Sequence, residues 1–237
     1  MRTFVMSDIH GCYREYRRLL QIIRFREEDM LYVIGDCVDK GDAPMELLKD
    51  MMARPNVVPL MGNHDLEALV ILRRLDEVRA DGEEPDSAFV ESVKDWLMDG
   101  GQPTLNGFLE LPFGERQGIL AYLETFFPYL EIEAGGKRYL LVHGGLEPFV
   151  PERKIEDYDI LQLLLSRPDY EKRYFRDRYT VTGHTPTPVV QKGNRGAVIR
   201  KNNHLAIDCG CVYGYRLAAV CLETGREYYV YSRQAAQ

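Results

Sequence analysis

Short apolar runs alternate with amphipathic stretches in the first third of the chain. The runs at residues 2–6, 30–34 and 56–61 each predict a short buried strand. Apolar residues at helical spacing follow each run, at about residues 16–23, 44–52 and 66–75, and Pro44 suits the first turn of the second helix. Three successive strand-loop-helix units indicate a parallel sheet with helices packed on it.

The hydrophobic pattern changes between residues 76 and 130. Residues 89–98 read as an amphipathic helix that carries Trp96, and Gly100 and Gly101 end it. We therefore expect a helical insertion at about 76–130, lying over the sheet edge.

Strand patterns dominate the remainder of the chain. We expect strands at 131–133, 139–143, 179–182, 197–200, 205–208, 217–222 and 227–231, with a tight hairpin at Gly135-Gly136. The strand and turn pattern of this half predicts a mostly antiparallel sheet. The most economical fold class is mixed α/β (α+β): a single domain over residues 1–237, with two mixed β-sheets packed face to face and flanked by helices.

Composition narrows the classes of partner. Lys and Arg number 30 against 37 Asp and Glu, a formal net charge of −7, which argues against a nucleic-acid partner. No apolar stretch approaches the ~18 residues of a membrane span, and the first residues lack a secretory signal. We expect a cytoplasmic protein without a membrane partner, whose five cysteines are buried thiols.

Four of the five histidines share one context, a predicted strand end followed by a glycine-flanked loop. Such loops gather at the carboxyl edge of a parallel sheet, where ligands bind. Imidazole, carboxylate and amide oxygen without thiolate suit manganese, iron or zinc in an open site. Six groups fit two ions that share one carboxylate, with Asp36 as the natural bridge. The converging residues are Asp8, His10, Asp36, Asn63, His143 and His184. His204 belongs to no motif, and we expect it to be solvated in a hairpin turn.

The same residues lie in five motifs that resemble the metallophosphoesterase superfamily, and within it the phosphoprotein phosphatase group with its bacterial and phage members. The family reads D-x-H-G, G-D-x-V-D-R-G, G-N-H-E/D, H-G and G-H-T. This chain has matching residues, in the same order, at 8–11, 35–41, 62–65, 143–144 and 183–185, and residues 207–210 look like the family's closing strand. The region 76–130 carries none of the motifs.

The resemblance implies a calcineurin-like sandwich fold and a two-ion site. Asp8, His10 and Asp36 would bind one ion, and Asp36, Asn63, His143 and His184 the other. Manganese is the first choice in vitro, with iron or zinc as alternatives. Two cations ~3.5–4 Å apart lower the pKa of a bridging water, which attacks as hydroxide in line, and neutralise phosphoryl oxygens. His64, oriented by Asp39, would be the catalytic general acid, a role typically worth ~10²–10⁴ in rate.

Substrate phosphate binding is expected at Asn63, Lys40 and Arg167. The family usually has Arg where this chain has Lys40, and an ammonium is a point charge where a guanidinium is a planar fork. The family's other phosphate-binding Arg follows a W-x-R pattern, which residues 165–167 match without the Trp.

The resemblance predicts a metal-dependent phosphatase acting on phosphomonoesters, with phosphoserine or phosphothreonine in proteins as the first choice. The alternative is a symmetrical hydrolase of dinucleoside polyphosphates such as diadenosine tetraphosphate, which would need a basic or aromatic clamp. From another class, an inactive pseudophosphatase would bind phosphoproteins only, but no expected ligand or acid is missing. The predicted partner is thus a phosphorylated protein or a small phosphoester.

Overall fold

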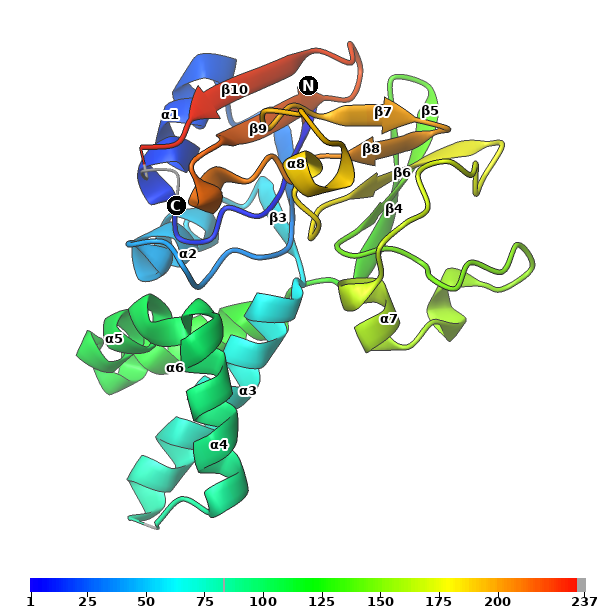
Figure 1. Ribbon diagram of the computed structural model, residues 1–237. Coiled ribbons are helices and arrows are strands. Elements are labelled where there is room, and N and C mark those ends of the chain that lie inside the picture. Colours follow the sequence, from blue (N-terminus) through cyan, green and yellow to red (C-terminus); the bar gives the residue numbers. More distant parts are fainter. Residues whose placement is uncertain (83, 234–237) are drawn as a thin grey trace.

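Two five-stranded β-sheets stack face to face in the computed structural model, which describes residues 1–82 and 84–233 (Figure 1). Residue 83 of the predicted insertion lies outside the described residues. The first sheet has the order β10-β9-β1-β2-β3 and the second β4-β5-β6-β8-β7. A layer of buried hydrophobic side chains, which includes Val5 and Val220 from the first sheet and Leu141 and Val181 from the second, fills the space between them. The predicted pair of packed mixed sheets flanked by helices is confirmed.

The three strand-loop-helix units at the start of the chain form as predicted. Parallel strands β1 (Thr3–Met6), β2 (Met30–Ile34) and β3 (Val57–Leu60) alternate with helices α1 (Tyr13–Ile23), α2 (Pro44–Met52) and α3 (Asn63–Asp81). Helix α3 begins three residues earlier than expected. Asp65 explains this start, because its carboxylate accepts the backbone N–H of Gly62 (3.0 Å) and caps the first turn.

The prediction for the second half of the chain is right only in part: its strand pairs are mostly antiparallel, but the second sheet is mixed and has a parallel core. Strands β5 (Lys137–Val142), β6 (Arg178–Thr182) and β8 (His204–Ala206) are parallel, and β4 (Tyr129–Ala134) and β7 (Ile199–Lys201) flank them in antiparallel orientation. Strands β9 (Arg216–Cys221) and β10 (Glu227–Tyr231) join the first sheet. Turn residues reveal hairpins, but the segment between β5 and β6 is long enough for a parallel crossover that turn chemistry does not show.

Helices α4 (Ser87–Trp96), α5 (Gln102–Glu110) and α6 (Phe113–Glu124) make up the predicted insertion. Together with α3 they form a helical arm that projects away from the sheets instead of covering a sheet edge (Figure 1). The break at the two glycines is a π-turn (Leu97–Gly101) in which Gly100 has φ 106°. The arm joins the body where α5 and α6 contact α2.

Smaller helices occupy the connections of the second sheet. These are α7 (Ile160–Leu165) and α8 (Thr187–Val190), with 3₁₀ turns at Ile155–Asp157 and Cys211–Tyr213. All five cysteines are buried thiols, as expected. Among the described residues, no helix has the length and apolar character needed to cross a bilayer.

His204 is not solvated, contrary to expectation. It is the first residue of β8 and 1% exposed, its Nε2 lies 3.0 Å from the carbonyl oxygen of Lys172, and its ring meets Tyr174 edge-on at 4.5 Å. The turn at Asn202-Asn203 is real, with both residues at positive φ. The His204 ring is instead buried by the segment around Tyr170 and Tyr174, some thirty residues earlier in the chain. The sequence next to His204 cannot reveal such a distant contact.

Candidate active site

The predicted site residues lie at the carboxyl ends of parallel strands from both sheets. Asp8 and His10 follow β1, Asp36 follows β2, Asn63 and His64 open α3 after β3, His143 follows β5 and His184 follows β6. The two sheets meet here, because the backbone N–H of His184 lies 3.1 Å from both carboxylate oxygens of Asp8. The carboxyl-edge rule therefore applies to both halves of the sandwich.

An unusual backbone shapes these loops. Four residues have φ between 44° and 64°, in the left-handed region that residues other than glycine rarely adopt: Asp8, His10, Asp36 and His184. Neighbouring loops hold this conformation, since His10 N–H donates to the Asp36 carbonyl oxygen (2.8 Å) and Asp8 N–H to that of Gly35 (3.1 Å). Such strain persists where surrounding structure enforces it, typically at functional sites.

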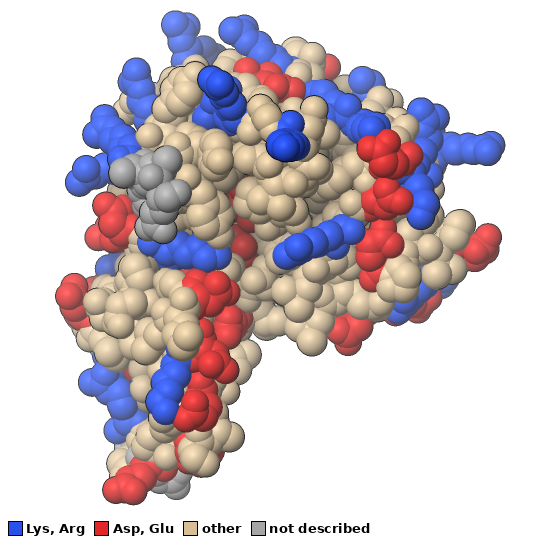
Figure 2. All heavy atoms as spheres, viewed as in Figure 1, with Lys and Arg blue, Asp and Glu red and all other residues tan. Residues whose placement is uncertain are grey.

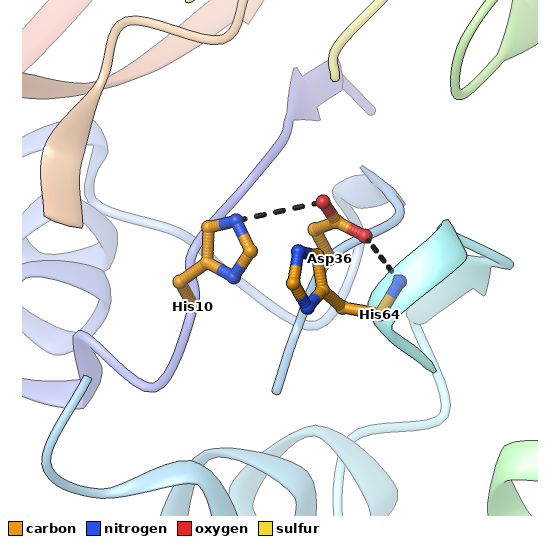
Figure 3. A group of neighbouring side chains, drawn as sticks. All are labelled: His10, Asp36 and His64. Carbon is orange, nitrogen blue, oxygen red and sulfur yellow. Dashed lines mark hydrogen bonds and ion pairs between the residues drawn. The ribbon is translucent and has the colours of Figure 1, made fainter. Parts of the chain in front are cut away.

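Asp36 and His10 form the first half of the centre. One carboxylate oxygen of Asp36, Oδ2, lies 3.5 Å from Nε2 of His10 (Figure 3). The other ring nitrogen, Nδ1, faces the Val38 carbonyl oxygen at 2.9 Å. Because a carbonyl only accepts, Nδ1 carries the proton and Nε2 is left as a lone-pair donor. His64 meets the edge of the His10 ring at a centroid distance of 4.9 Å, so this group could also be read as a three-ligand set.

The second half lies on the opposite side of the same carboxylate. Oδ1 of Asp36 is 3.4 Å from Nε2 of His143, whose Nδ1 faces the Ile34 carbonyl oxygen at 2.9 Å. The amide oxygen of Asn63 lies 3.1 Å from that Nε2 and 2.9 Å from Nδ1 of His184. Four donor atoms thus converge, and Asp36 faces both halves with a different oxygen.

The electrostatics of the site fit a cation. Burial and the neighbouring Asp208 carboxyl raise the pKa of Asp8 well above its usual value. Burial alone would lower the pKa of His143, yet the Asp36 charge raises it to about 10, whereas burial lowers the pKa of His10 to about 3. Buried carboxyl groups this close together repel unless positive charge lies among them. Metal ions bound by the oxygen and nitrogen donors would supply that charge.

Asp208 is a buried member of this group that the sequence analysis did not single out. It follows β8, a further parallel strand, and burial raises its pKa to about 7. The sequence did contain a sign of Asp208, because residues 207–210 look like the family's closing strand. Cys37 is also buried here, and burial raises the pKa of its thiol well above the usual value, which disfavours a thiolate ligand.

His64 and Asp39 form a pair beside the metal-binding groups. Nδ1 of His64 is 2.8 Å from Oδ2 of Asp39, and both side chains are buried. Burial alone would lower the pKa of His64, but the hydrogen bond to Asp39 raises it. The insertion also reaches this pair through Trp96 and Thr104, which the sequence analysis did not predict.

The two predicted phosphate-binding cations lie near different histidines of the site. The Lys40 ammonium is 2.6 Å from Nε2 of His64. Burial and His143 lower the pKa of His184 to about 4, and the positive charge of Arg167 adds to this shift, so Arg167 lies near enough to act on His184 electrostatically.

Comparison with known proteins agrees with this geometry. The model of the calcineurin-like phosphoesterase family matches residues 1–221. A symmetrical bis(5'-nucleosyl)-tetraphosphatase from Nitrosospira multiformis is 32% identical over 168 residues, covering 70% of this chain and 50% of the relative. The chain thus spans about half the length of that relative. A protein of the same name from Neisseria gonorrhoeae is 26% identical and covers 94% of this chain and 93% of its own.

A solved structure has the same fold as this chain. The crystal structure of a candidate diadenosine tetraphosphatase superposes with a TM-score of 0.67 at 19% identity, covering 99% of this chain and 95% of the other. The resemblance drawn from the five motifs is therefore confirmed, and the chain belongs to the calcineurin-like phosphoesterase family.

Proposed function

We propose that this protein hydrolyses dinucleoside polyphosphates of the diadenosine tetraphosphate class in a metal-dependent, symmetrical reaction. The observation that carries the proposal is the position of Asp36, one carboxylate with its two oxygens 3.5 Å from His10 and 3.4 Å from His143. This is the arrangement that a shared ligand of two ions needs. The names of the curated relatives supply the substrate class.

Asp8, His10 and Asp36 would hold one ion, and Asp36, Asn63, His143 and His184 the other. When bound, the ions neutralise phosphoryl oxygens and activate the attacking water. The donor set accepts manganese, iron or zinc, and we expect manganese to support activity in vitro. Ion content after loading, measured by elemental analysis, tests the stoichiometry.

His64 is proposed to donate a proton to the leaving phosphate oxygen. Asp39 favours the charged imidazole by holding Nδ1, so that Nε2 faces Lys40. Lys40, Arg167 and Asn63 would contact the substrate phosphates. A buried imidazolium paired with a carboxylate is suited to this role, because the pair stays oriented while the proton leaves.

A groove beside the site offers the clamp that a nucleotide requires. It has a volume of about 690 Å³, and Lys192, Arg195 and Arg216 line it together with Tyr215 and Tyr231. The chain links the groove to the centre, because Tyr213 directly precedes the lining residue Gly214 and its ring lies 5.8 Å from the Lys40 ammonium. Cationic and aromatic side chains suit phosphates and a base.

The charge distribution separates this side from the arm. Figure 2 shows Lys and Arg over the sheets, whereas Asp and Glu gather along one edge of the helical arm. Within the arm, burial raises the pKa of Glu67, and the nearby carboxylates of Asp99 and Asp95 raise it further. A polyanionic substrate would therefore extend from the centre toward the basic groove and away from the arm.

A substrate panel tests the proposal. The manganese-loaded protein is assayed with diadenosine tetraphosphate, a phosphoserine peptide and a phosphotyrosine peptide. We expect the highest kcat/KM with diadenosine tetraphosphate and ADP as the only nucleotide product, because symmetrical cleavage yields two equal halves. A Tyr215→Ala variant should raise KM for this substrate and leave p-nitrophenyl phosphate turnover unchanged.

Phosphoserine or phosphothreonine in proteins is the second candidate, favoured by the sequence resemblance to the phosphoprotein phosphatases. Preference for the phosphoserine peptide in the panel would replace the first proposal with this one. Absence of turnover with every substrate and every divalent ion would instead favour a pseudophosphatase that only binds.

A further inference from the structure

The helical insertion reaches the His64–Asp39 pair through two side chains. The indole Nε1 of Trp96 lies 2.9 Å from Oδ2 of Asp39, and the hydroxyl of Thr104 lies 2.6 Å from Oδ1. Asp39, Trp96 and Thr104 are each fully buried. These contacts span 57 and 65 residues of sequence, so they tie the insertion directly to the motif segment.

The hydrogen-bond chemistry of this cluster leaves one arrangement. An indole N–H only donates, so Asp39 accepts from Trp96. The Thr104 hydroxyl oxygen accepts the backbone N–H of Asp39 at 2.9 Å, and its own proton is then directed to Oδ1. Asp39 is thus an acceptor toward both neighbours and remains an acceptor toward Nδ1 of His64. The ring of His64 must present its Nδ1 proton to Asp39 and its Nε2 to the substrate side.

The backbone of the insertion also contacts the turn that contains Asp39 and Lys40. Asp39 and Lys40 have φ of 68° and 65°, and the Lys40 N–H donates to the Gly100 carbonyl oxygen at 2.8 Å. Gly100 makes this approach with φ 106°, and a Cβ there would lie 2.6 Å from Cγ of Lys40. The π-turn (Leu97–Gly101) therefore supports the strained catalytic turn from outside the motifs.

We propose that Trp96 and Thr104 are positioning residues, which act through Asp39 to fix the orientation of His64 for proton donation. The inference rests on the general-acid role of His64 in the proposed function. It assigns the insertion a part in catalysis, because without these donors the Asp39 carboxylate could rotate and release the His64 ring.

The first test does not depend on activity. Trp96 is the only tryptophan of the chain, so the protein has a single indole N–H resonance in a ¹⁵N-resolved NMR spectrum. We expect this resonance to lie downfield, as for a charge-assisted hydrogen bond, and to move upfield in Asp39→Asn but not in Asp99→Asn. An unshifted resonance in Asp39→Asn would overturn the Trp96 part of the inference.

The second test compares leaving groups. Phenyl phosphate has a poor leaving group that needs the acid, whereas p-nitrophenyl phosphate departs with little help. Trp96→Phe and Thr104→Val should lower kcat on phenyl phosphate about tenfold, the order of one charge-assisted hydrogen bond, and change p-nitrophenyl phosphate turnover much less. KM and ion content should not change, and Thr104→Ser should restore the rate.

Tyr122→Phe is the matched control, because this variant also removes a buried polar group from the insertion. Among the described residues the Tyr122 hydroxyl has no hydrogen-bond partner, so its loss should leave kcat unchanged on both substrates. Equal losses on both substrates, or Thr104→Val behaving as Tyr122→Phe, would contradict the positioning role. Failure of the wild-type protein to hydrolyse any phosphoester would refute the proposed function and with it the catalytic role of the two residues, while the NMR result would still decide the Trp96–Asp39 contact.

Discussion

The ammonium of Lys40 lies 2.6 Å from Nε2 of His64. Burial alone would lower the pKa of Lys40, but Tyr213 and Asp36 raise it above its usual value, so the side chain stays charged. Because Asp39 engages the opposite nitrogen of the imidazole and an ammonium can only donate, Nε2 of His64 accepts from Lys40 in this arrangement, and both groups face the same space. A phosphate placed there would meet the cation and the acid together.

Replacement of Lys40 tests whether charge or planar geometry matters at this position. Lys40→Met should lower kcat/KM about 10- to 100-fold, the order of one charge-assisted contact to phosphate. Lys40→Arg keeps the charge and should retain activity within a few-fold, because the motif that residues 35–41 resemble usually has Arg at this position. Steady-state kinetics on one phosphoester measure both variants, and full activity of Lys40→Met would exclude a role for the cation.

His64→Asn should abolish most turnover while both ions remain bound. The expected loss is ~10²–10⁴ in kcat, the range typical of a general acid. Elemental analysis decides between the two readings of the site, because His64 also lies within the group of His10 and Asp36 that could hold an ion. Loss of an ion in this variant would make His64 a ligand instead. His204→Asn, which changes an equally buried histidine away from the site, should leave the kcat of the folded protein unchanged.

Asp36→Asn and Asp8→Asn should differ in the number of ions lost. Asp36 faces His10 with one oxygen and His143 with the other, so its amide variant should lose both ions and all activity. Asp8 belongs to one half, and Asp8→Asn should retain about one ion per chain. Elemental analysis and calorimetric titration with manganese measure the stoichiometry, and equal loss from both variants would argue against a shared carboxylate.

The sequence revealed the parts of the fold that depend on local pattern. The first three strand-loop-helix units and the loops at their ends follow from hydrophobic spacing and from the glycine-flanked motifs around Asp8, Asp36 and Asn63. The mixed pairing in the second sheet was missed, because the direction of β6 and β8 depends on long crossovers. Trp96 and Thr104 were missed for the same reason. Their contact with Asp39 crosses more than fifty residues, and neither lies in a motif.

Gly183→Ala should disrupt the metal-binding site and leave the fold intact. A Cβ at this position would lie 2.1 Å from the Ser7 hydroxyl oxygen and 2.2 Å from Oδ2 of Asp8, so Asp8 must shift. We expect weaker manganese binding and at least a 10-fold loss of kcat/KM, as follows when a catalytic group is displaced by about 1 Å. Gly118→Ala is the control, because a Cβ there meets nothing within 4 Å inside α6. It should raise stability by about 0.5–1 kcal/mol with unchanged activity, and equal manganese affinity in both variants would refute the steric argument.

The Asp29 carboxylate should make stability depend on pH in the acid range. It is 1% exposed and accepts hydrogen bonds from the backbone N–H of Arg2 (3.0 Å), the Arg2 guanidinium and the backbone N–H of Arg26 (3.1 Å). Burial alone would raise the pKa of Asp29, but the hydrogen bonds from Arg2 and Arg26 outweigh burial and lower it. A carboxylate with a depressed folded-state pKa stabilises the protein above its unfolded pKa of ~3.9, and this contribution disappears as the pH falls through the folded value.

Asp29→Asn should therefore lower the free energy of unfolding by about 1.5–3 kcal/mol at pH 7, the range for hydrogen bonds to a charged group. The difference from wild type should stay constant down to about pH 5 and shrink below pH 4, as the wild-type carboxylate becomes protonated too. Urea denaturation at a series of pH values measures this. Glu28→Gln changes the neighbouring, solvent-exposed carboxylate paired with Arg26 at 3.5 Å, and it should have little effect at any pH. A difference for Asp29→Asn that persists unchanged at pH 3 would mean that packing and not charge accounts for the loss.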